Sequence, residues 1–184
     1  MRWLAGFALV VALGLTAQAQ MNMGSTSMKS LQNTFGKTFD VYWMSQMIEH
    51  HTGALEMAKA ELKDGKDARV KKAAQQIVTD QSREITQMTG WLKSWYNTVP
   101  DKKKMALMRA DLKPMLEGGM AGMNDDPDKR FLEGMIPHHQ SAVEMGKLAL
   151  KKAVRPELKT FAQGVIDAQS KEIKVYQMWL KTWK

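Results

Sequence analysis

The chain has 184 residues, no cysteine, and a formal net charge of +8 at pH 7. The lack of cysteine excludes disulfides, cysteine-bound clusters and lipids attached to a cysteine. Lysines are spread along the chain, with one run over residues 102–104, and no nucleic-acid-binding motif accompanies them. We therefore expect no nucleic-acid role. The 16 methionines are the unusual part of the composition.

The N-terminus has the three regions of a secretory signal peptide, which we place at residues 1–19. Arg2 supplies the positive charge, residues 3–15 form an apolar run, and Ala17 and Ala19 are the small residues of a cleavage site. We expect cleavage after Ala19 and a periplasmic or secreted location. The mature chain should have no membrane span, because no later stretch is long and uncharged enough.

The next segments predict a linker and a first helical hairpin. Residues 20–36 are rich in Ser, Thr, Asn and Met, which is typical of a flexible linker. The first repeat, residues 37–97, has a helix over about 38–62 and a second over about 67–96 with apolar residues at helical spacing. Pro100 follows the second helix, as expected beyond a helix end.

The remainder of the chain predicts a connection and a second hairpin. The connection, residues 98–126, contains a short helix over about 102–116 and a glycine-rich flexible segment over 117–123. The second repeat, residues 127–184, has two helices separated just before Pro156. Two antiparallel hairpins joined by a long crossover predict an all-α, ferritin-like four-helix bundle.

The two hairpins are copies of each other at a constant offset of 88 residues. The offset pairs every histidine with another histidine and continues without a gap to the tryptophans near the end of each repeat. The clearest copies are Met47-x2-His50-His51-x5-Met57 and Met135-x2-His138-His139-x5-Met145. Pro137 breaks the equivalence, because its counterpart is Glu49 and because proline removes a helical hydrogen bond and should bend the helix.

Methionine and histidine in this pattern point to a soft-metal site. Residues three and four apart are neighbours on a helix, so each copy should present a stripe of thioethers and imidazoles. Thioether sulfur favours Cu(I) or Ag(I), while imidazole accepts soft and borderline ions. We therefore predict a copper site that prefers Cu(I) over Cu(II) and also suits Ag(I). Its ligands would come from Met47, His50, His51, Met57, Met135, His138, His139 and Met145.

Other residues have secondary or structural interpretations. We assign Met44, Met88 and Met178 to the core, together with the tryptophans near the bundle ends. Weaker Cu(I) sites that load or buffer the metal are a hypothesis for Met21, Met23, Met28, Met105, Met108, Met120 and Met123. The repeated Gln81, Glu84, Gln169 and Glu172 either hydrogen-bond the distal histidine nitrogens or lie on the surface.

Competing chemistry finds less support. A di-iron bundle needs Glu-x-x-His, and here methionine stands three residues before His50 and before His138. Haem would need ligands on opposite sides of the porphyrin, and no serine elbow or phosphate loop indicates a hydrolase. We expect no enzyme, but two alternatives stay open: a copper-dependent redox enzyme that oxidises Cu(I), and a metal-free interaction bundle.

The repeated residues resemble a known family. Met, His-His, Ala and Met on one helix, followed by Gln, Glu-Ile and Trp-Leu on the next, are similar to the bacterial exported family called domain of unknown function 305. The resemblance covers nearly the whole mature chain, twice. It implies a ferritin-like helical protein, and copper-binding members imply periplasmic copper sequestration, resistance or handover to a partner protein. It places the metal on the eight residues named above, although Glu49 departs from the family's Pro-His-His form.

Overall fold

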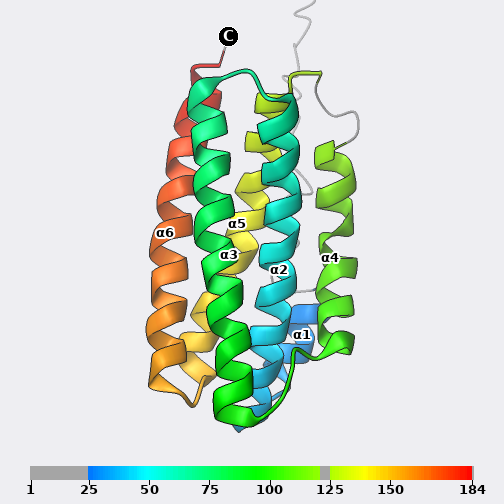
Figure 1. Ribbon diagram of the computed structural model, residues 1–184, viewed down its shortest axis with the longest axis vertical. Coiled ribbons are helices and arrows are strands. Elements are labelled where there is room, and N and C mark those ends of the chain that lie inside the picture. Colours follow the sequence, from blue (N-terminus) through cyan, green and yellow to red (C-terminus); the bar gives the residue numbers. More distant parts are fainter. Residues whose placement is uncertain (1–24, 121–124, 184) are drawn as a thin grey trace, which may run out of the picture.

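The computed structural model describes residues 25–120 and 125–183 of the chain, and within them every regular element is an α-helix. The predicted all-α class is therefore confirmed. Four long helices make up the bundle, as Figure 1 shows: α2 (Gly36–Asp64), α3 (Ala68–Tyr96), α5 (Pro127–Lys152) and α6 (Pro156–Lys181). The predicted signal peptide lies outside the described residues. None of the described helices is long and apolar enough to cross a membrane.

The two predicted hairpins are present, and they meet through their first helices. Helix α2 packs along α3, and α5 packs along α6, while α2 and α5 also contact each other. The buried residues of α2 and α5 include all four histidines. The repeated first helices therefore share the interior of the molecule, and the second helices cover them from outside.

Side-chain caps and prolines set the helix starts where the sequence predicts them. The Asp67 carboxylate accepts the N–H of Arg69 at the start of α3, and Asp126 accepts two N–H groups in the first turn of α5. Pro127 and Pro156 begin α5 and α6, where the missing N–H of proline costs no helical hydrogen bond. Helix α5 then continues unbroken through Pro137.

The prediction of a flexible linker over residues 20–36 is wrong for its second half, which contains helix α1 (Thr26–Gln32). Met28 and Leu31 of α1 are buried in the hydrophobic core. The Asp111 carboxylate accepts the N–H of Ser27 over 2.8 Å and so satisfies a free donor at the helix start. A helix this short is not stable alone. Only the tertiary contacts with α2 and with helix α4 (Lys102–Met120) explain it, and local composition does not show them.

Helix α4 (Lys102–Met120) occupies most of the connection and continues beyond the predicted end at about 116. It packs along both α2 and α5, where Leu112 and Leu116 are buried. The first four residues of the segment expected to be flexible, 117–120, are therefore helical, and residues 121–124 lie outside the described part. The glycines of this segment suggested a loop, but the apolar face of α4 holds the helix against the bundle.

Two buried aspartates tie each hairpin to the loop of the other, and we call these contacts the loop clasps. Asp40 of α2 accepts the N–H groups of Val154 and Arg155 in the α5–α6 loop, at 3.0 and 3.2 Å, and also the hydroxyl of Tyr96. Asp40 is fully buried. The clasp therefore satisfies backbone donors that would otherwise be left in the interior.

The second clasp repeats the first in the opposite direction. Asp128 of α5 accepts the N–H groups of Lys66 and Asp67 in the α2–α3 loop, at 3.0 and 2.9 Å. Asp40 and Asp128 are 88 residues apart, so the repeat register pairs them as it pairs the histidines. The repeat thus extends to the contacts that join the two halves.

Candidate metal centre

The four histidines lie in the interior of the bundle, and each is fully buried. His50 of α2 and His138 of α5 face each other, with ring centroids 3.9 Å apart and an interplanar angle of 44°. The second histidine of each pair is turned away, with its ring centroid 6.1 Å from that of its neighbour. The expected pair of complete stripes is therefore modified: one histidine of each pair meets its counterpart at the centre, and the other points elsewhere.

The outer histidines each contact a carboxylate on the covering helix. His51 Nε2 lies 2.7 Å from Glu84 Oε2 on α3, and His139 Nε2 lies 2.9 Å from Glu172 Oε2 on α6. A carboxylate beside Nε2 favours the tautomer with the proton on that nitrogen, which leaves Nδ1 as the lone-pair donor. Both Nδ1 atoms are buried without a hydrogen-bond partner. The predicted hydrogen bond from the covering helix is confirmed for Glu84 and His51, whereas Glu172 lies within ion-pair distance of His139 without forming a hydrogen bond.

The repeated glutamines behave differently from the glutamates. Gln81 and Gln169 are buried, and the side-chain oxygen of each lacks a hydrogen-bond partner. Their burial excludes the surface interpretation. Their support of the histidines remains a prediction, because Glu84 and Glu172 already occupy the outer histidine nitrogens.

The two central histidines have unequal surroundings. His50 Nε2 lies 2.7 Å from the Ser141 hydroxyl and 3.1 Å from the carbonyl oxygen of His138. Neither ring nitrogen of His138 has a hydrogen-bond partner. Gly53, the counterpart of Ser141 in the repeat, is the reason: a Cβ added there would lie 3.5 Å from His138 Nε2. Buried polar atoms without partners are rare in folded proteins, so the nitrogens of His138 are candidate metal ligands.

Burial also fixes the charge state of the central pair. Desolvation, followed by the charges of neighbouring histidines, holds the pKa of His50 and of His138 well below the usual 6.5. Both imidazoles are therefore neutral at pH 7, the form in which a histidine nitrogen binds a metal. The site is ready to bind without releasing a proton from either ring.

The four predicted methionine ligands are all buried on α2 and α5, the helices that carry the histidines. Their exposed fractions are 0 to 4 % for Met47, Met57, Met135 and Met145. Among the described residues, no three His, Asp or Glu side chains come together as a metal-binding group. An ion bound at the centre would therefore need thioether sulfur to complete its coordination. Such a donor set suits Cu(I) or Ag(I) and disfavours zinc, magnesium and calcium.

The remaining methionines divide into core and surface. Met44 and Met88 lie in the hydrophobic core as predicted, and Met28 and Met108 also lie there. Met178 is 56 % exposed, so its assignment to the core is wrong. Its helical spacing placed it on the outer face of α6. Met120 is the last residue of α4, and the predictions for Met21, Met23 and Met123 fall outside the described residues.

The tryptophans are structural, as predicted. Trp43 is fully buried, and its Nε1 donates a hydrogen bond of 2.8 Å to the backbone carbonyl of Met145. This bond links α2 to α5 next to a predicted ligand. Trp91 stacks on Trp95 with ring centroids 4.5 Å apart. The Trp43 indole therefore links the two helices that carry the histidines, and the Trp91–Trp95 stack lies within α3.

Sequence reasoning missed Ser141, Gly53 and the two clasp aspartates. The repeat register contained a signal for the aspartates, because Asp40 and Asp128 are 88 residues apart. At Gly53 and Ser141 the two repeats differ. The effect of that difference on the histidines can be seen only when the positions of α2 and α5 relative to each other are known.

The chain belongs to the family described as Domain of unknown function (DUF305), whose model matches residues 14–92 and 128–184. The matched ranges contain both hairpins up to Leu92 in the first, and they omit most of the connection that contains α4. The family assignment therefore agrees with the repeated architecture.

Solved structures similar to this chain include CopM in several metal-bound forms. The Cu(I)-bound form is 30 % identical, covers 78 % of this chain and 96 % of its own, and has a TM-score of 0.65. The Cu(II)-bound form has a TM-score of 0.67 at 30 % identity over 79 % and 97 % of the two chains, and an Ag-bound form has 0.65 at 31 % over 78 % and 96 %.

Two further similarities are more distant or shorter. A putative secreted DUF305 protein from Streptomyces coelicolor is 25 % identical over 74 % of this chain and 88 % of its own, with a TM-score of 0.60. Uncharacterized protein L153 of Acanthamoeba polyphaga mimivirus is 41 % identical over 46 residues, 25 % of this chain. The chain covers only 30 % of the length of that curated relative.

Proposed function

We propose that this protein is an exported copper-binding protein that prefers Cu(I) and acts in envelope copper sequestration, resistance or handover to a partner protein. One observation carries the proposal: the central pair of His50 and His138 is buried, neutral and short of hydrogen-bond partners. Solved forms of CopM with Cu(I), Cu(II) and Ag support copper and silver as the metals.

The preference for Cu(I) follows from the donors. The central pair offers two neutral imidazoles, and buried thioethers lie on the same two helices. Cu(II) favours a planar set of nitrogen and oxygen donors, whereas Cu(I) accepts few ligands and prefers sulfur. Neutral donors in a buried site also disfavour the higher charge of Cu(II), because the protein supplies little to offset it.

The arrangement supports one connected centre with two arms. His50 and His138 meet between α2 and α5, and each is followed in the chain by a histidine that a glutamate holds in place. We propose that copper binds first at the central pair, where both repeats contribute. The outer histidines, with free Nδ1 atoms, extend the donor set toward α3 and α6.

We propose binding without catalysis. A copper oxidase must let oxygen and electrons reach the metal, whereas the four imidazoles here are completely buried. Retention of the ion suits such burial better than turnover does. Oxygen consumption during aerobic mixing with Cu(I) measures the difference: rates at the level of a protein-free control are expected, and sustained consumption would favour the redox enzyme.

The methionines allow a test that preserves the core. Met→Leu conserves volume and usually costs less than about 1.5 kcal/mol, yet it removes the sulfur donor. The combined variant M47L/M57L/M135L/M145L should bind Cu(I) at least about tenfold more weakly in an anaerobic chelator competition, because even outer-shell changes have effects of that size. The matched control is M44L/M88L, which changes equally buried methionines outside the pattern.

Two outcomes separate the proposal from its alternatives. Equal loss in the test variant and the control would attribute the effect to packing, and unchanged affinity in both would exclude thioether ligation. Histidine ligation adds a second expectation, a Cu(I) affinity that decreases only once the pH drops well below 6.5, because burial lowers the pKa of His50 and His138 and protons compete for their nitrogens only there. An affinity independent of pH would contradict it.

A further inference from the structure

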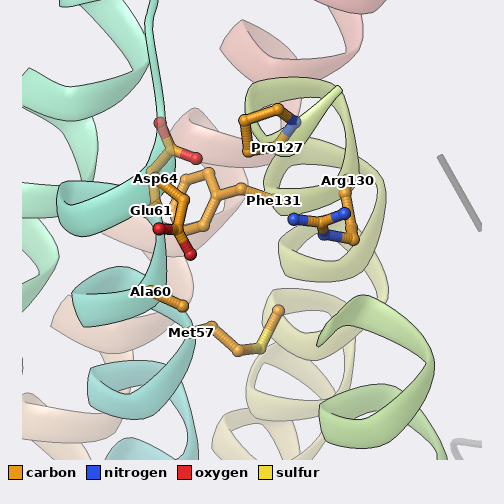
Figure 2. A pocket seen from close by; sticks show the side chains of 7 residues that line it. All are labelled: Met57, Ala60, Glu61, Asp64, Pro127, Arg130 and Phe131. Carbon is orange, nitrogen blue, oxygen red and sulfur yellow. The ribbon is translucent and has the colours of Figure 1, made fainter. Parts of the chain in front are cut away.

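A pocket of about 230 Å³ lies between α2 and α5, at the end of these helices where α2 finishes and α5 begins. Figure 2 shows its walls: Glu61 and Asp64 come from α2, with Phe131 behind them, and Arg130 of α5 lies across the opening. Met57, a predicted copper ligand, forms the inner wall. The pocket is therefore next to the candidate metal centre.

Glu61 is the unusual residue of this pocket. It is only 2 % exposed, and no neighbouring group donates a hydrogen bond to either carboxyl oxygen. Desolvation, a side-chain hydrogen bond to Asp128 and the charge of Asp128 raise the pKa of Glu61 to about 8. The ionised carboxylate therefore lacks donors in the fold, and a bound cation that replaced the proton would satisfy its oxygens.

A second carboxylate lies beside Glu61 at the mouth of the pocket. Asp64 is exposed and follows Glu61 by three residues on α2, so the two side chains share one face of the helix. Figure 2 shows the two carboxyl groups next to each other. Asp64 can meet an ion in solvent, and Glu61 can hold it after its water is removed. Two carboxylates with one thioether behind them form a different donor set from the central imidazoles.

We propose that this pocket is a second metal site, in which Glu61 and Asp64 bind a divalent ion such as Cu(II) through oxygen. The site does not require the histidines, so it goes beyond the Cu(I) function proposed above. Met57 lines this pocket, so the second site lies next to the buried centre but binds copper in the other oxidation state.

The repeat supplies an internal comparison. At an offset of 88 residues the counterpart of Glu61 is Ala149, and the counterpart of Asp64 is Lys152. The second hairpin therefore lacks both carboxylates and has a positive charge in place of one. Each chain should have one such site, even though its histidines and methionines are present twice.

The test separates the two sites by metal and by spectroscopy. The protein is first loaded to saturation with Ag(I), which has no unpaired electron and occupies soft donors, and its Ag(I) stoichiometry is recorded. Cu(II) is then titrated at pH 7.5 and followed by electron paramagnetic resonance. We expect one bound Cu(II) per chain, with oxygen coordination and no nitrogen hyperfine splitting.

Three variants decide the assignment. E61Q is nearly isosteric and should lose the Cu(II) signal, while its Ag(I) stoichiometry stays unchanged. D64N lies on the exposed surface, so it should fold normally and weaken Cu(II) binding by about tenfold or more. E117Q, at an exposed glutamate that is paired with Lys113 on α4, is the control and should behave as wild type.

Each contrary result has one meaning. A Cu(II) signal retained in both E61Q and D64N, or a wild-type signal with nitrogen splitting, would overturn the second site. Loss of the signal in E117Q as well would identify it as unspecific surface binding. Failure of the Ag(I) loading would count against the soft-metal centre and leave the Cu(II) result to be judged separately.

Discussion

At the scale of single residues, the two halves differ most where Ser141 of one repeat matches Gly53 of the other. The Ser141 hydroxyl contacts His50 Nε2, whereas nothing hydrogen-bonds either nitrogen of His138. A metal that binds His50 through Nε2 must replace that hydroxyl contact, and a metal that binds His138 replaces none. His138 is therefore the stronger anchor of the two.

The exchange of these two residues gives a testable prediction. G53S should place a hydroxyl close to His138 Nε2, where it competes with the metal, and S141A should remove the shorter of the two contacts of His50 Nε2, leaving the one to the His138 carbonyl oxygen. Because a hydrogen bond contributes about 0.5–1.5 kcal/mol net, we expect Cu(I) affinity to fall about two- to tenfold in the first variant and to rise by a similar factor in the second. Anaerobic chelator competition measures both.

Crowding at position 53 needs a control. An added Cβ would lie 3.3 Å from Leu112 Cδ1 and 3.4 Å from Leu116 Cδ2 on α4. G53A introduces the same crowding without the hydroxyl, so it should leave Cu(I) affinity close to wild type. If G53A and G53S weaken binding equally, the competition by the hydroxyl is refuted.

The sequence predicted the site residues that occur in both repeats. The histidines, their methionines, and Glu84 with Glu172 recur at the same offset, and helical spacing places them inside. Glu61 has no copy, and its surface-like neighbour Asp64 gives no sign of burial. Glu61 lies in a pocket only because the first turn of α5 packs against the end of α2, and these two segments are far apart in the chain.

At the scale of helices, the loop clasps join elements that the sequence could place only separately. Each clasp spans from the first helix of one hairpin to the loop inside the other. It therefore holds α2 and α5 at the spacing at which His50 and His138 meet. Trp43 also links α2 to α5, through its hydrogen bond to the Met145 carbonyl oxygen.

Removal of one clasp charge should loosen the whole bundle. D40N keeps the size of the side chain but weakens the acceptor of three hydrogen bonds. Hydrogen bonds to charged groups contribute about 1.5–3 kcal/mol, so we expect the free energy of unfolding in urea to fall by about 2 kcal/mol. D80N changes a partly exposed aspartate of α3 and should stay within about 0.5 kcal/mol of wild type.

A further consequence of D40N concerns metal binding. If the clasp sets the spacing of α2 and α5, its loss should weaken Cu(I) binding although no ligand is changed. A variant with lower stability and unaltered Cu(I) affinity would confine Asp40 to a structural role, and unaltered stability would show that the clasp contributes nothing measurable.

The helices that sequence reasoning described best are those with their own caps and periodic apolar faces. Helices α3, α5 and α6 begin close to their predicted residues because aspartate or proline marks the start. Helix α1 and the end of α4 were missed. Their residues have weak or mixed local preferences. Contacts with α2 and α4 make α1 helical, and contacts with α2 and α5 do the same for the end of α4.

At the scale of the whole molecule, two kinds of buried group should give the metal-free protein a stability maximum near pH 6.5. His50 and His138 have pKa values well below 6.5 in the fold, so below pH 6.5 the unfolded chain binds protons that the folded one refuses. Stability then falls with decreasing pH by about 1.4 kcal/mol per pH unit for each histidine.

Glu61 acts in the opposite direction. Its pKa is raised to about 8 in the fold, so between about 4.5 and 8 the unfolded chain releases a proton that the folded chain keeps. Stability therefore decreases as pH rises through this range, and above pH 6.5 this decrease is no longer offset by the histidines. Urea unfolding of the metal-free protein at pH 5.5, 6.5 and 8 should give the highest free energy at 6.5.

The variant E61Q separates the two contributions. Without the carboxyl, the loss of stability between pH 6.5 and 8 should disappear, while the loss below 6.5 remains. A wild-type curve that is flat from pH 5.5 to 8, or an E61Q curve that still declines above 6.5, would contradict these roles for the buried groups.

The loop clasps also bear on how the centre is assembled. Each half lends an aspartate to the other and receives one in return, the reciprocal pattern of a symmetric dimer interface. A free hairpin could obtain these contacts only by meeting a second copy, at a rate limited by its abundance. Tethering both copies in one chain replaces that encounter with a high effective concentration. The paired histidines can therefore form in a single molecule, however dilute the protein is.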